Sequence, residues 1–289
     1  MARVIVGEYV MEIVCSLNES LDEKIAEYGW NLFRNQYKEV NGHFLRGDNS
    51  DAVILAEKID SINAESGLND CGACVDVGVL NLCGQNPYEY ISALSYRVKV
   101  VIVRENDGVH DGSLLPFTTV VDGRVQMDWL GVIRGLREIK FDGLLFFDFW
   151  DTTKVFSPLL RPQLLELAKS VADFFAWQIK VEEYLTSYKS IVLFGAGNMC
   201  RNYMKCYGEK YPPLFTCDNN PKLWDTKYCG LDVKSPKCLN ELSEECVIMI
   251  CNTHYFEIRK QLEDMGVKNE VVFFNDEYLP TYYFDRVER

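Results

Sequence analysis

A glycine turn after an apolar segment carries the clearest chemical signal in this sequence. Residues 190–194 read Ser-Ile-Val-Leu-Phe, and Gly195, Gly197 and Asn198 come directly after them. In a phosphate-binding turn the first glycine makes the tight bend, the second lets the backbone approach a phosphate, and the next helix presents free N–H groups. We therefore predict that Gly195, Gly197 and Asn198 bind the phosphates of a nucleotide or nucleotide-sugar.

Two further positions bear on this prediction. Asp218 ends the next apolar segment, about twenty residues beyond the glycines, where an acidic side chain binds ribose hydroxyls. Cys200 stands where a third glycine would let the helix pack closely on the strand, although a small residue often substitutes there. The alternative that the glycines only make a tight turn stays open. Hydride transfer is less favoured, because no set of catalytic residues identifies a dehydrogenase.

The composition is that of a well-packed globular protein large enough for two domains. The chain has 289 residues, of which 48% are apolar, and its net charge of −13 opposes nucleic acid as a partner, since phosphate tracking needs clustered Lys and Arg. The 11 cysteines are scattered through apolar patterns, which favours reduced, buried thiols. We find no apolar run long enough to span a bilayer and no secretory leader, so a cytoplasmic protein without a membrane partner is expected.

Residues 1–157 repeat a pattern in which an apolar strand is followed by an amphipathic helix. Strands are predicted at residues 3–7, 30–35, 71–77, 98–103 and 143–149. Helices are predicted at residues 10–28, 50–66, 87–96 and 127–139, and a linking helix at residues 158–187. Because each crossover helix returns the chain in the same direction, the pattern predicts an α/β fold with five parallel strands.

Residues 188–289 predict a second domain with its own parallel sheet. After the glycine turn, strands are predicted at residues 214–217, 247–251 and 270–274, and a helix at residues 254–265. The run of glycine turn, Asp218-Asn219, Gly-x-x-Val at 230–233 and Pro236 resembles the small Rossmann-like domain found beside sugar-modifying methyltransferases, glycosyltransferases and sugar acyltransferases. The resemblance implies a nucleotide or nucleotide-sugar ligand rather than one particular reaction.

Short motifs in the first domain also occur in a recognisable order. They are Val-Asp-Val-Gly at residues 75–78, Asn-Pro-Tyr-Glu-Tyr-Ile at 86–91, and the segments 98–108, 114–116 and 141–143. Over roughly residues 1–180 the chain resembles the sugar-phosphate isomerase/epimerase family, whose members are xylose-isomerase-like TIM barrels. The resemblance implies an incomplete, five-stranded parallel barrel. Because five strands cannot close a barrel of eight, we expect a homo-oligomer or a partner chain to cover the open barrel edge.

The same resemblance implies where a metal site would lie. Family members are expected to hold a divalent metal with two Glu, one Asp and one His at the carboxyl ends of the strands. Asp76 fills the Asp position, and Asp148 stands in place of one Glu. Arg34 replaces the other Glu, and Val79 stands in place of the His. We therefore predict that the barrel binds no divalent metal and does not carry out metal-dependent isomerisation.

Four residues remain as candidates at the mouth of this barrel: Arg34, Asp76, Arg104 and Asp148. They indicate either structural ion pairs that fill the vacated metal position, which we favour, or a metal-free pocket for an anionic sugar. The overall prediction is a carbohydrate-metabolism protein that binds a sugar, nucleotide or nucleotide-sugar and acts as an accessory component. The alternative is an active sugar-phosphate isomerase/epimerase completed by a partner chain.

Overall fold

The structure is a computed structural model, and it describes residues 2–6, 9–13, 44–46, 51–67, 71–121, 124–125 and 127–274. The chain divides into two compact units, Met1–Ile179 and Lys180–Arg289, which are described separately below. The predicted strand at residues 30–35, most of the predicted helix at residues 10–28, and the candidate residue Arg34 lie outside the described residues.

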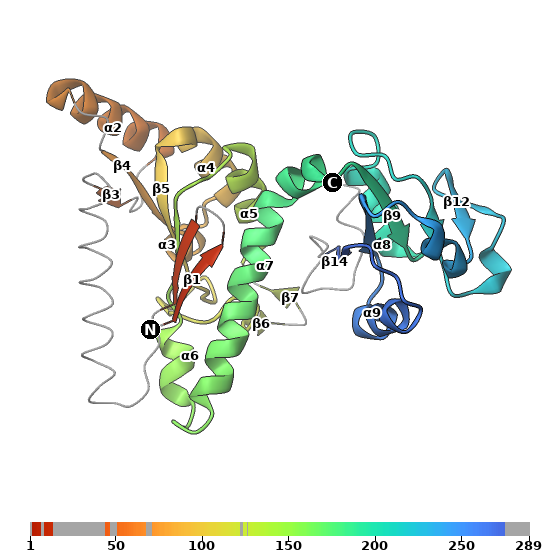
Figure 1. Ribbon diagram of the computed structural model, residues 1–289. Coiled ribbons are helices and arrows are strands. Elements are labelled where there is room, and N and C mark those ends of the chain that lie inside the picture. Colours follow the sequence, from red (N-terminus) through yellow and green to blue (C-terminus); the bar gives the residue numbers. More distant parts are fainter. Residues whose placement is uncertain are drawn as a thin grey trace. The chain divides into compact units, whose positions relative to one another are not determined.

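A six-stranded sheet in the order β1-β2-β8-β5-β4-β3 forms the centre of the first unit (Figure 1). Its strands are β1 Ala2–Val6, β2 Tyr9–Ile13, β3 Phe44–Arg46, β4 Gly72–Asp76, β5 Val98–Val103 and β8 Leu144–Phe147. β3, β4, β5 and β8 are parallel and lie side by side in chain order. β2 continues the sheet in parallel beside β8, and β1 pairs antiparallel with β2. The described strands therefore form an open, mostly parallel sheet.

β4, β5 and β8 agree with predicted parallel strands. β1 lies where a strand is predicted, but the prediction that it is parallel to the others is wrong, because it pairs antiparallel with β2. The prediction of a helix from residue 10 is wrong for residues 10–13, which belong to β2. Val10 and Ile13 fit a helical period, but so short a segment also fits a strand, and pairing with β1 and β8 satisfies its backbone groups. β3 is missing from the prediction because three residues are too few to show a period.

Four helices of the first unit begin where the sequence supplies a capping side chain. The described helices of this unit are α2 Ala52–Ser66, α3 Val77–Leu82, α4 Pro87–Leu94, α5 Trp129–Glu138, α6 Trp150–Val155 and α7 Arg161–Ser187, with a 3-10 turn η1 at Ser95–Arg97. Asp51, Asp76, Asn86 and Asp128 each accept a backbone N–H in the first turn of α2, α3, α4 and α5, respectively. A two-stranded ribbon, β6 Val120–Val121 with β7 Arg124–Val125, precedes α5.

The main apolar core of the first unit lies between one face of the sheet and helices α2, α4, α5 and α7. Phe175 of α7 is fully buried, and its ring centroid lies 5.2 Å from that of Trp129, 5.6 Å from Phe147 and 5.7 Å from Phe117. These aromatic contacts join α7 to α5 and to β8. The opposite face carries a smaller cluster with Cys74, Val100, Ile102 and Phe146.

The second unit is built on another six-stranded sheet, in the order β11-β12-β10-β9-β13-β14. Its strands are β9 Ser190–Phe194, β10 Thr216–Cys217, β11 Lys227–Tyr228, β12 Leu231–Lys234, β13 Cys246–Ile250 and β14 Val271–Phe273. Its helices are α8 Asn198–Cys206 and α9 Tyr255–Asp264, with 3-10 turns η2 Pro221–Leu223 and η3 Pro236–Glu241. All strands are parallel except the β11–β12 pair. β9, β10, β13 and β14 agree with predicted strands, whereas β11 and β12 lie where no strand is predicted.

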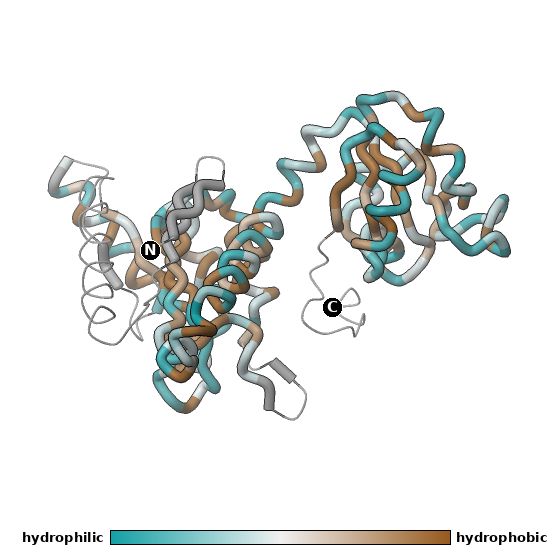
Figure 2. Tube along the Cα trace, turned by 60° about the horizontal axis from the view of Figure 1, so that its bottom comes forward, coloured by the Kyte–Doolittle hydropathy of each residue, from teal (hydrophilic) through white to brown (hydrophobic). Residues whose placement is uncertain are grey.

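Burial explains why β9 and β13 are the central strands of this unit. Every residue of β13 and four of the five residues of β9 are buried, which is the pattern of a parallel strand covered on both faces. Figure 2 shows the apolar residues concentrated along these central strands, with polar residues on the surrounding segments. Among the described helices, none combines the length and the apolar composition that crossing a membrane requires.

The aromatic contacts of Phe175 provide a test of the first core. Replacing Phe175 by Ala should lower the free energy of unfolding by about 3–5 kcal/mol, because a fully buried ring is lost and a cavity remains. Leu167 on the same helix is 52% exposed, and Leu167→Ala is the matched control with a much smaller expected effect. Urea unfolding monitored by circular dichroism measures both. Equal losses for the two variants would contradict the described packing of α7.

Candidate functional site

Gly195 occupies a position of the second unit that no side chain could fill. It follows β9 directly, is buried, and has a φ of +122°, which L residues rarely adopt. A Cβ atom built there would lie 2.6 Å from the carbonyl oxygen of Cys251, which follows β13. The sheet order reverses between β9 and β13, so the turn lies at the topological switch point, where open α/β sheets bind ligands.

Gly197 and Asn198 form the accessible part of the same turn. Both residues are exposed, and a Cβ atom at Gly197 would meet no atom within 4 Å. α8 begins at Asn198, and its N-cap Gly197 offers no side chain to the first N–H groups of the helix. Such N–H groups, together with the helix dipole, favour an anion. The turn therefore has both the space and the donors that a phosphate requires.

Asp218 follows β10 and is held against the glycine turn by contacts that the sequence does not indicate. Its Oδ2 accepts the N–H of Ala196 at 2.8 Å, and its Oδ1 accepts the N–H of Asn220 at 2.8 Å. The carboxylate thus fixes the turn between β9 and α8. Each oxygen keeps a lone pair, so the half-buried carboxylate can still accept a hydroxyl hydrogen.

Cys200, at the position of the missing third glycine, faces the inside of the domain. Its side chain is fully buried, and burial raises the pKa of the thiol to about 12. The thiol therefore stays protonated at neutral pH and behaves as a small apolar side chain between α8 and the sheet. A cysteine is small enough to allow the helix–strand packing for which the third glycine is otherwise needed.

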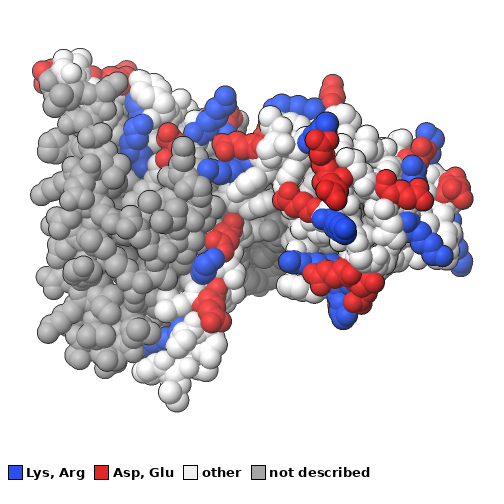
Figure 3. Space-filling view, in the orientation of Figure 1, with Lys and Arg blue, Asp and Glu red and all other residues white. Residues whose placement is uncertain are grey.

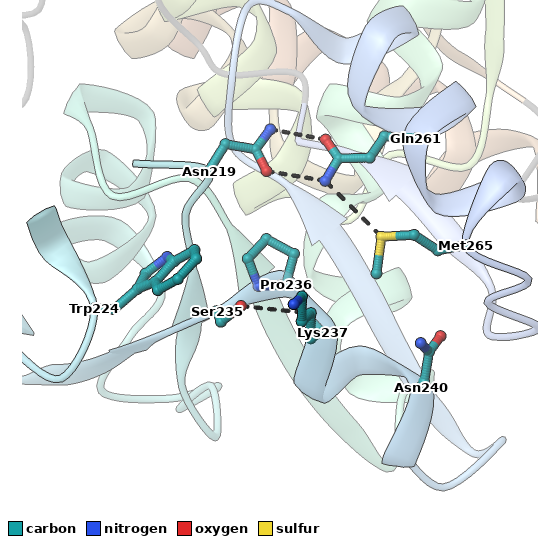
Figure 4. A pocket seen from close by; sticks show the side chains of 8 residues that line it. All are labelled: Asn219, Trp224, Ser235, Pro236, Lys237, Asn240, Gln261 and Met265. Carbon is teal, nitrogen blue, oxygen red and sulfur yellow. Dashed lines mark hydrogen bonds between the residues drawn. The ribbon is translucent and has the colours of Figure 1, made fainter. Parts of the chain in front are cut away.

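A pocket next to Asp218 is a feature that the sequence analysis missed. Its volume is about 510 Å³, within the range of ligand sites, and it opens beyond the carboxyl ends of β10 and β12 (Figure 4). The residues that line it are Asn219, Trp224, Ser235, Pro236, Lys237, Asn240, Gln261 and Met265. These residues come from three separate segments of the unit. No local motif connects them, although Asn219 and Pro236 belong to the resemblance noted above.

In the first unit, three of the four candidate residues at the barrel mouth come together. Asp76, Arg104 and Asp148 follow or end β4, β5 and β8, and strand alternation puts them on the sheet face of the smaller apolar cluster. The Nε of Arg104 donates to Oδ1 of Asp76 at 2.8 Å, and both side chains are buried. Arg34, the fourth candidate, lies outside the described residues.

Further polar groups close around this ion pair. The Nη1 of Arg104 donates to Oδ1 of Asp111 at 2.5 Å and to the carbonyl oxygen of Gly112 at 3.1 Å. Asp148 accepts the hydroxyl hydrogen of Ser113 at 2.8 Å. Burial raises the pKa of the Asp148 carboxyl, although the hydrogen bond from Ser113 and the charge of Arg104 act in the opposite direction. Asp76 and Arg104 are thus directly bonded, whereas Asp148 is held by Ser113 and influenced by the two charges.

Glu105 has a structural role that the sequence does not indicate. Its side chain is fully buried and accepts the backbone N–H groups of Phe117 and Thr119 and the indole N–H of Trp129, the last at 3.0 Å. It thereby holds the loop that follows β5, in which Phe117 has a φ of +73°. A glutamate that follows an apolar strand is common in sequences, so the sequence does not indicate that Glu105 holds this loop. Only its burial in the structure shows that role.

The described residues contain no group of three or more His, Cys, Asp or Glu side chains arranged to hold a metal ion. At the carboxyl end of β4 the carboxylate of Asp76 is occupied by the guanidinium of Arg104 and by the N–H of Val79 at 3.2 Å. On the face of the second unit visible in Figure 3, basic and acidic side chains are mixed. Such a surface differs from the single-sign patch typical of nucleic-acid binding.

Comparison with known proteins bears on the second unit. A family model described as C2185-like, N-terminal matches residues 187–273, which is less than half of the chain. The matched segment begins just before β9 and ends with β14, so it coincides with the sheet that carries the glycine turn. A search of curated proteins found no match to this chain.

The buried ion pair predicts a large loss of stability when one partner is removed. Asp76→Asn should lower the free energy of unfolding by about 3–5 kcal/mol, because it leaves the buried guanidinium of Arg104 without its buried carboxylate partner. Adding Arg104→Met to this variant should recover part of the loss. The exposed pair of Asp60 and Arg97, at 2.6 Å, supplies the control, and Asp60→Asn should have a much smaller effect. Similar losses for Asp76→Asn and Asp60→Asn would show that the buried pair is not structural.

Removing the charge of Asp148 should stabilise the fold at neutral pH, in contrast to the loss of stability expected for Asp76→Asn. A carboxyl whose pKa is raised in the folded state contributes stability below its unfolded pKa of about 3.9, and this contribution is lost as pH rises through the folded pKa. Asp148→Asn should therefore raise the melting temperature at pH 7 and leave it nearly unchanged at about pH 3. Asp142→Asn changes an exposed aspartate of the same unit and is the control. A lower melting temperature at neutral pH would mean that Arg104 needs the charge of Asp148.

Proposed function

We propose that the second unit is a Rossmann-like domain that binds the phosphates of a nucleotide or nucleotide-sugar at its glycine turn. The observation that carries the proposal is the accessible turn at the switch point, where Gly197 leaves open space in front of an α8 N-terminus without a side-chain cap. The strand order β12-β10-β9-β13-β14 supports it, because this is the order of a doubly wound nucleotide-binding sheet.

Asp218 gives the proposal a second contact. Its carboxylate lies at the end of β10, where such domains bind ribose hydroxyls, and it already holds the N–H of Ala196 in the turn. One side chain would then connect the phosphate-binding turn with the sugar of the nucleotide. The same hydrogen bond also explains why the turn is ordered before any ligand binds.

The proposed role of the whole protein is that of a binding or accessory component in carbohydrate metabolism. The parallel series β3, β4, β5 and β8 supports the resemblance of the first unit to part of a sugar-phosphate isomerase barrel. The contacts of Asp76 favour binding over metal-dependent isomerisation, because Arg104 takes the place at this carboxylate that a metal would need. We further propose that a second copy or a partner chain covers the edge of the sheet.

A substitution at Gly197 tests the phosphate site without disturbing the fold. Its φ of −130° and ψ of −162° suit any residue, so Gly197→Val should lower the melting temperature only slightly, because valine is a poorer N-cap residue than glycine. The valine side chain would occupy the space in front of α8, and the affinity for inorganic pyrophosphate should fall by about tenfold or more, which corresponds to the loss of one or two charge-assisted hydrogen bonds. Isothermal titration calorimetry with the full chain measures this affinity.

Two comparison variants make the result specific. Gly197→Ala adds a smaller group and should weaken pyrophosphate binding less than valine does. Ser243→Val, an exposed position before the amino end of β13, should leave binding unchanged. The proposal fails if wild-type protein binds no pyrophosphate, or if Gly197→Val binds it as tightly as wild type.

A further inference from the structure

We propose that the pocket beside Asp218 binds a nucleobase, and that Trp224 and the side-chain amides of Asn219 and Gln261 recognise it. This inference rests on the proposed function, since the base would belong to the nucleotide whose phosphates lie on the glycine turn. It goes further by naming the chemical class that fills a separate pocket, lined by residues that the phosphate site does not use.

Trp224 supplies a fixed aromatic surface. Its indole N–H donates to the carbonyl oxygen of Asp218 at 2.7 Å, so the ring is oriented before a ligand arrives. In Figure 4 the ring extends into the pocket on one side of Pro236, and Met265 lies on the other side. Pro236 is buried and forms the floor between them. A flat heteroaromatic ring fits such a surface, because stacking on an aromatic side chain and contact with a thioether both favour polarizable π systems.

Asn219 and Gln261 supply a hydrogen-bonding edge. Their amides are paired with each other: the Nδ2 of Asn219 donates to Oε1 of Gln261 at 2.7 Å, and the Nε2 of Gln261 donates to Oδ1 of Asn219 at 2.9 Å. A side-chain amide that makes two hydrogen bonds with a second amide can make the same two hydrogen bonds with the edge of a base that has a donor next to an acceptor. The pair therefore keeps both groups satisfied and provides two amides that can exchange partners on binding.

The position of the pocket connects it with the phosphate site. Asp218 contacts the glycine turn through its carboxylate and Trp224 through its carbonyl group, and Asn219 is the next residue along the chain. A ribose at Asp218 would thus have the phosphate turn on one side and the pocket on the other. The lining residues include no Asp or Glu, so a free sugar would find no carboxylate to accept its hydroxyl hydrogens there.

The test compares ligands with and without a base on the full chain. Isothermal titration calorimetry is carried out with inorganic pyrophosphate and with ADP, GDP, UDP and CDP. At least one of the four nucleotides should bind about tenfold or more tightly than pyrophosphate, which is the increment expected from stacking one base. The nucleotide that binds best identifies the base.

Variants of the lining residues then test whether the gain in affinity of the nucleotide over pyrophosphate comes from this pocket. Trp224→Leu should bring nucleotide affinity down to that of pyrophosphate while pyrophosphate affinity stays within about twofold of wild type, since the turn is untouched. Trp224→Phe keeps a ring and should retain part of the increment, which distinguishes lost stacking from a misfolded loop. Gln261→Leu should weaken nucleotide binding and leave pyrophosphate binding unchanged. Circular dichroism establishes that each variant is folded.

The outcomes separate this inference from the proposed function. Should pyrophosphate bind and all four nucleotides bind no more tightly, the base site is disproved and the phosphate site stands. An increment that survives in Trp224→Leu and Gln261→Leu would place the base outside this pocket and would likewise overturn the inference. If neither pyrophosphate nor any nucleotide binds, both the phosphate site and the base site are disproved.

Discussion

The close approach of two backbone segments at Gly195 is the constraint on which the second unit depends. A side chain there would collide with the carbonyl group of Cys251, so only glycine lets β9 and β13 end next to each other. The same residue donates its N–H to the carbonyl oxygen of Cys217 at 2.6 Å, and its carbonyl oxygen accepts the hydroxyl hydrogen of Thr216 at 3.0 Å. Three strand ends thereby converge at one point. The accessible turn, the carboxylate of Asp218 and the adjoining pocket all follow from this convergence.

The carboxyl ends of the strands are used differently in the first unit. There, the buried charged groups have partners: Arg104 binds the buried Asp76 and the exposed Asp111, and Glu105 accepts three N–H groups of the chain that follows. Burying a charge without a partner is costly, so such groups are constrained to stay paired. In the second unit, by contrast, the N–H groups at the start of α8 lack a side-chain cap and Gly197 is open to solvent. This contrast is why we place ligand binding in the second unit.

Local patterns account for much of the fold, and the exceptions have identifiable causes. β5 at Val98–Val103 and α2 at Ala52–Ser66 agree with the predicted ranges within two residues, because each shows a long, unambiguous period. β2 lies where the sequence predicts a helix, because five residues fit either period and only pairing with β1 and β8 decides between them. The sequence identifies Asp76 and Arg104 as candidates but does not show that they pair. The two residues are 28 positions apart, and they meet only because β4 and β5 are neighbours in the sheet.

The sequence by itself determined the alternation of strands and helices, the glycine turn and the acidic residue after β10, because each is encoded by neighbouring residues. Tertiary structure alone decided that Asp218 holds the turn through Ala196, that Glu105 fixes the loop after β5, and that Asn219 faces Gln261. Asn219 and Gln261 are 42 positions apart, and hydrogen bonding over such a separation leaves no periodic signal in the chain. The pocket they border exists only because the sheet brings the ends of β10 and β12 to the same edge.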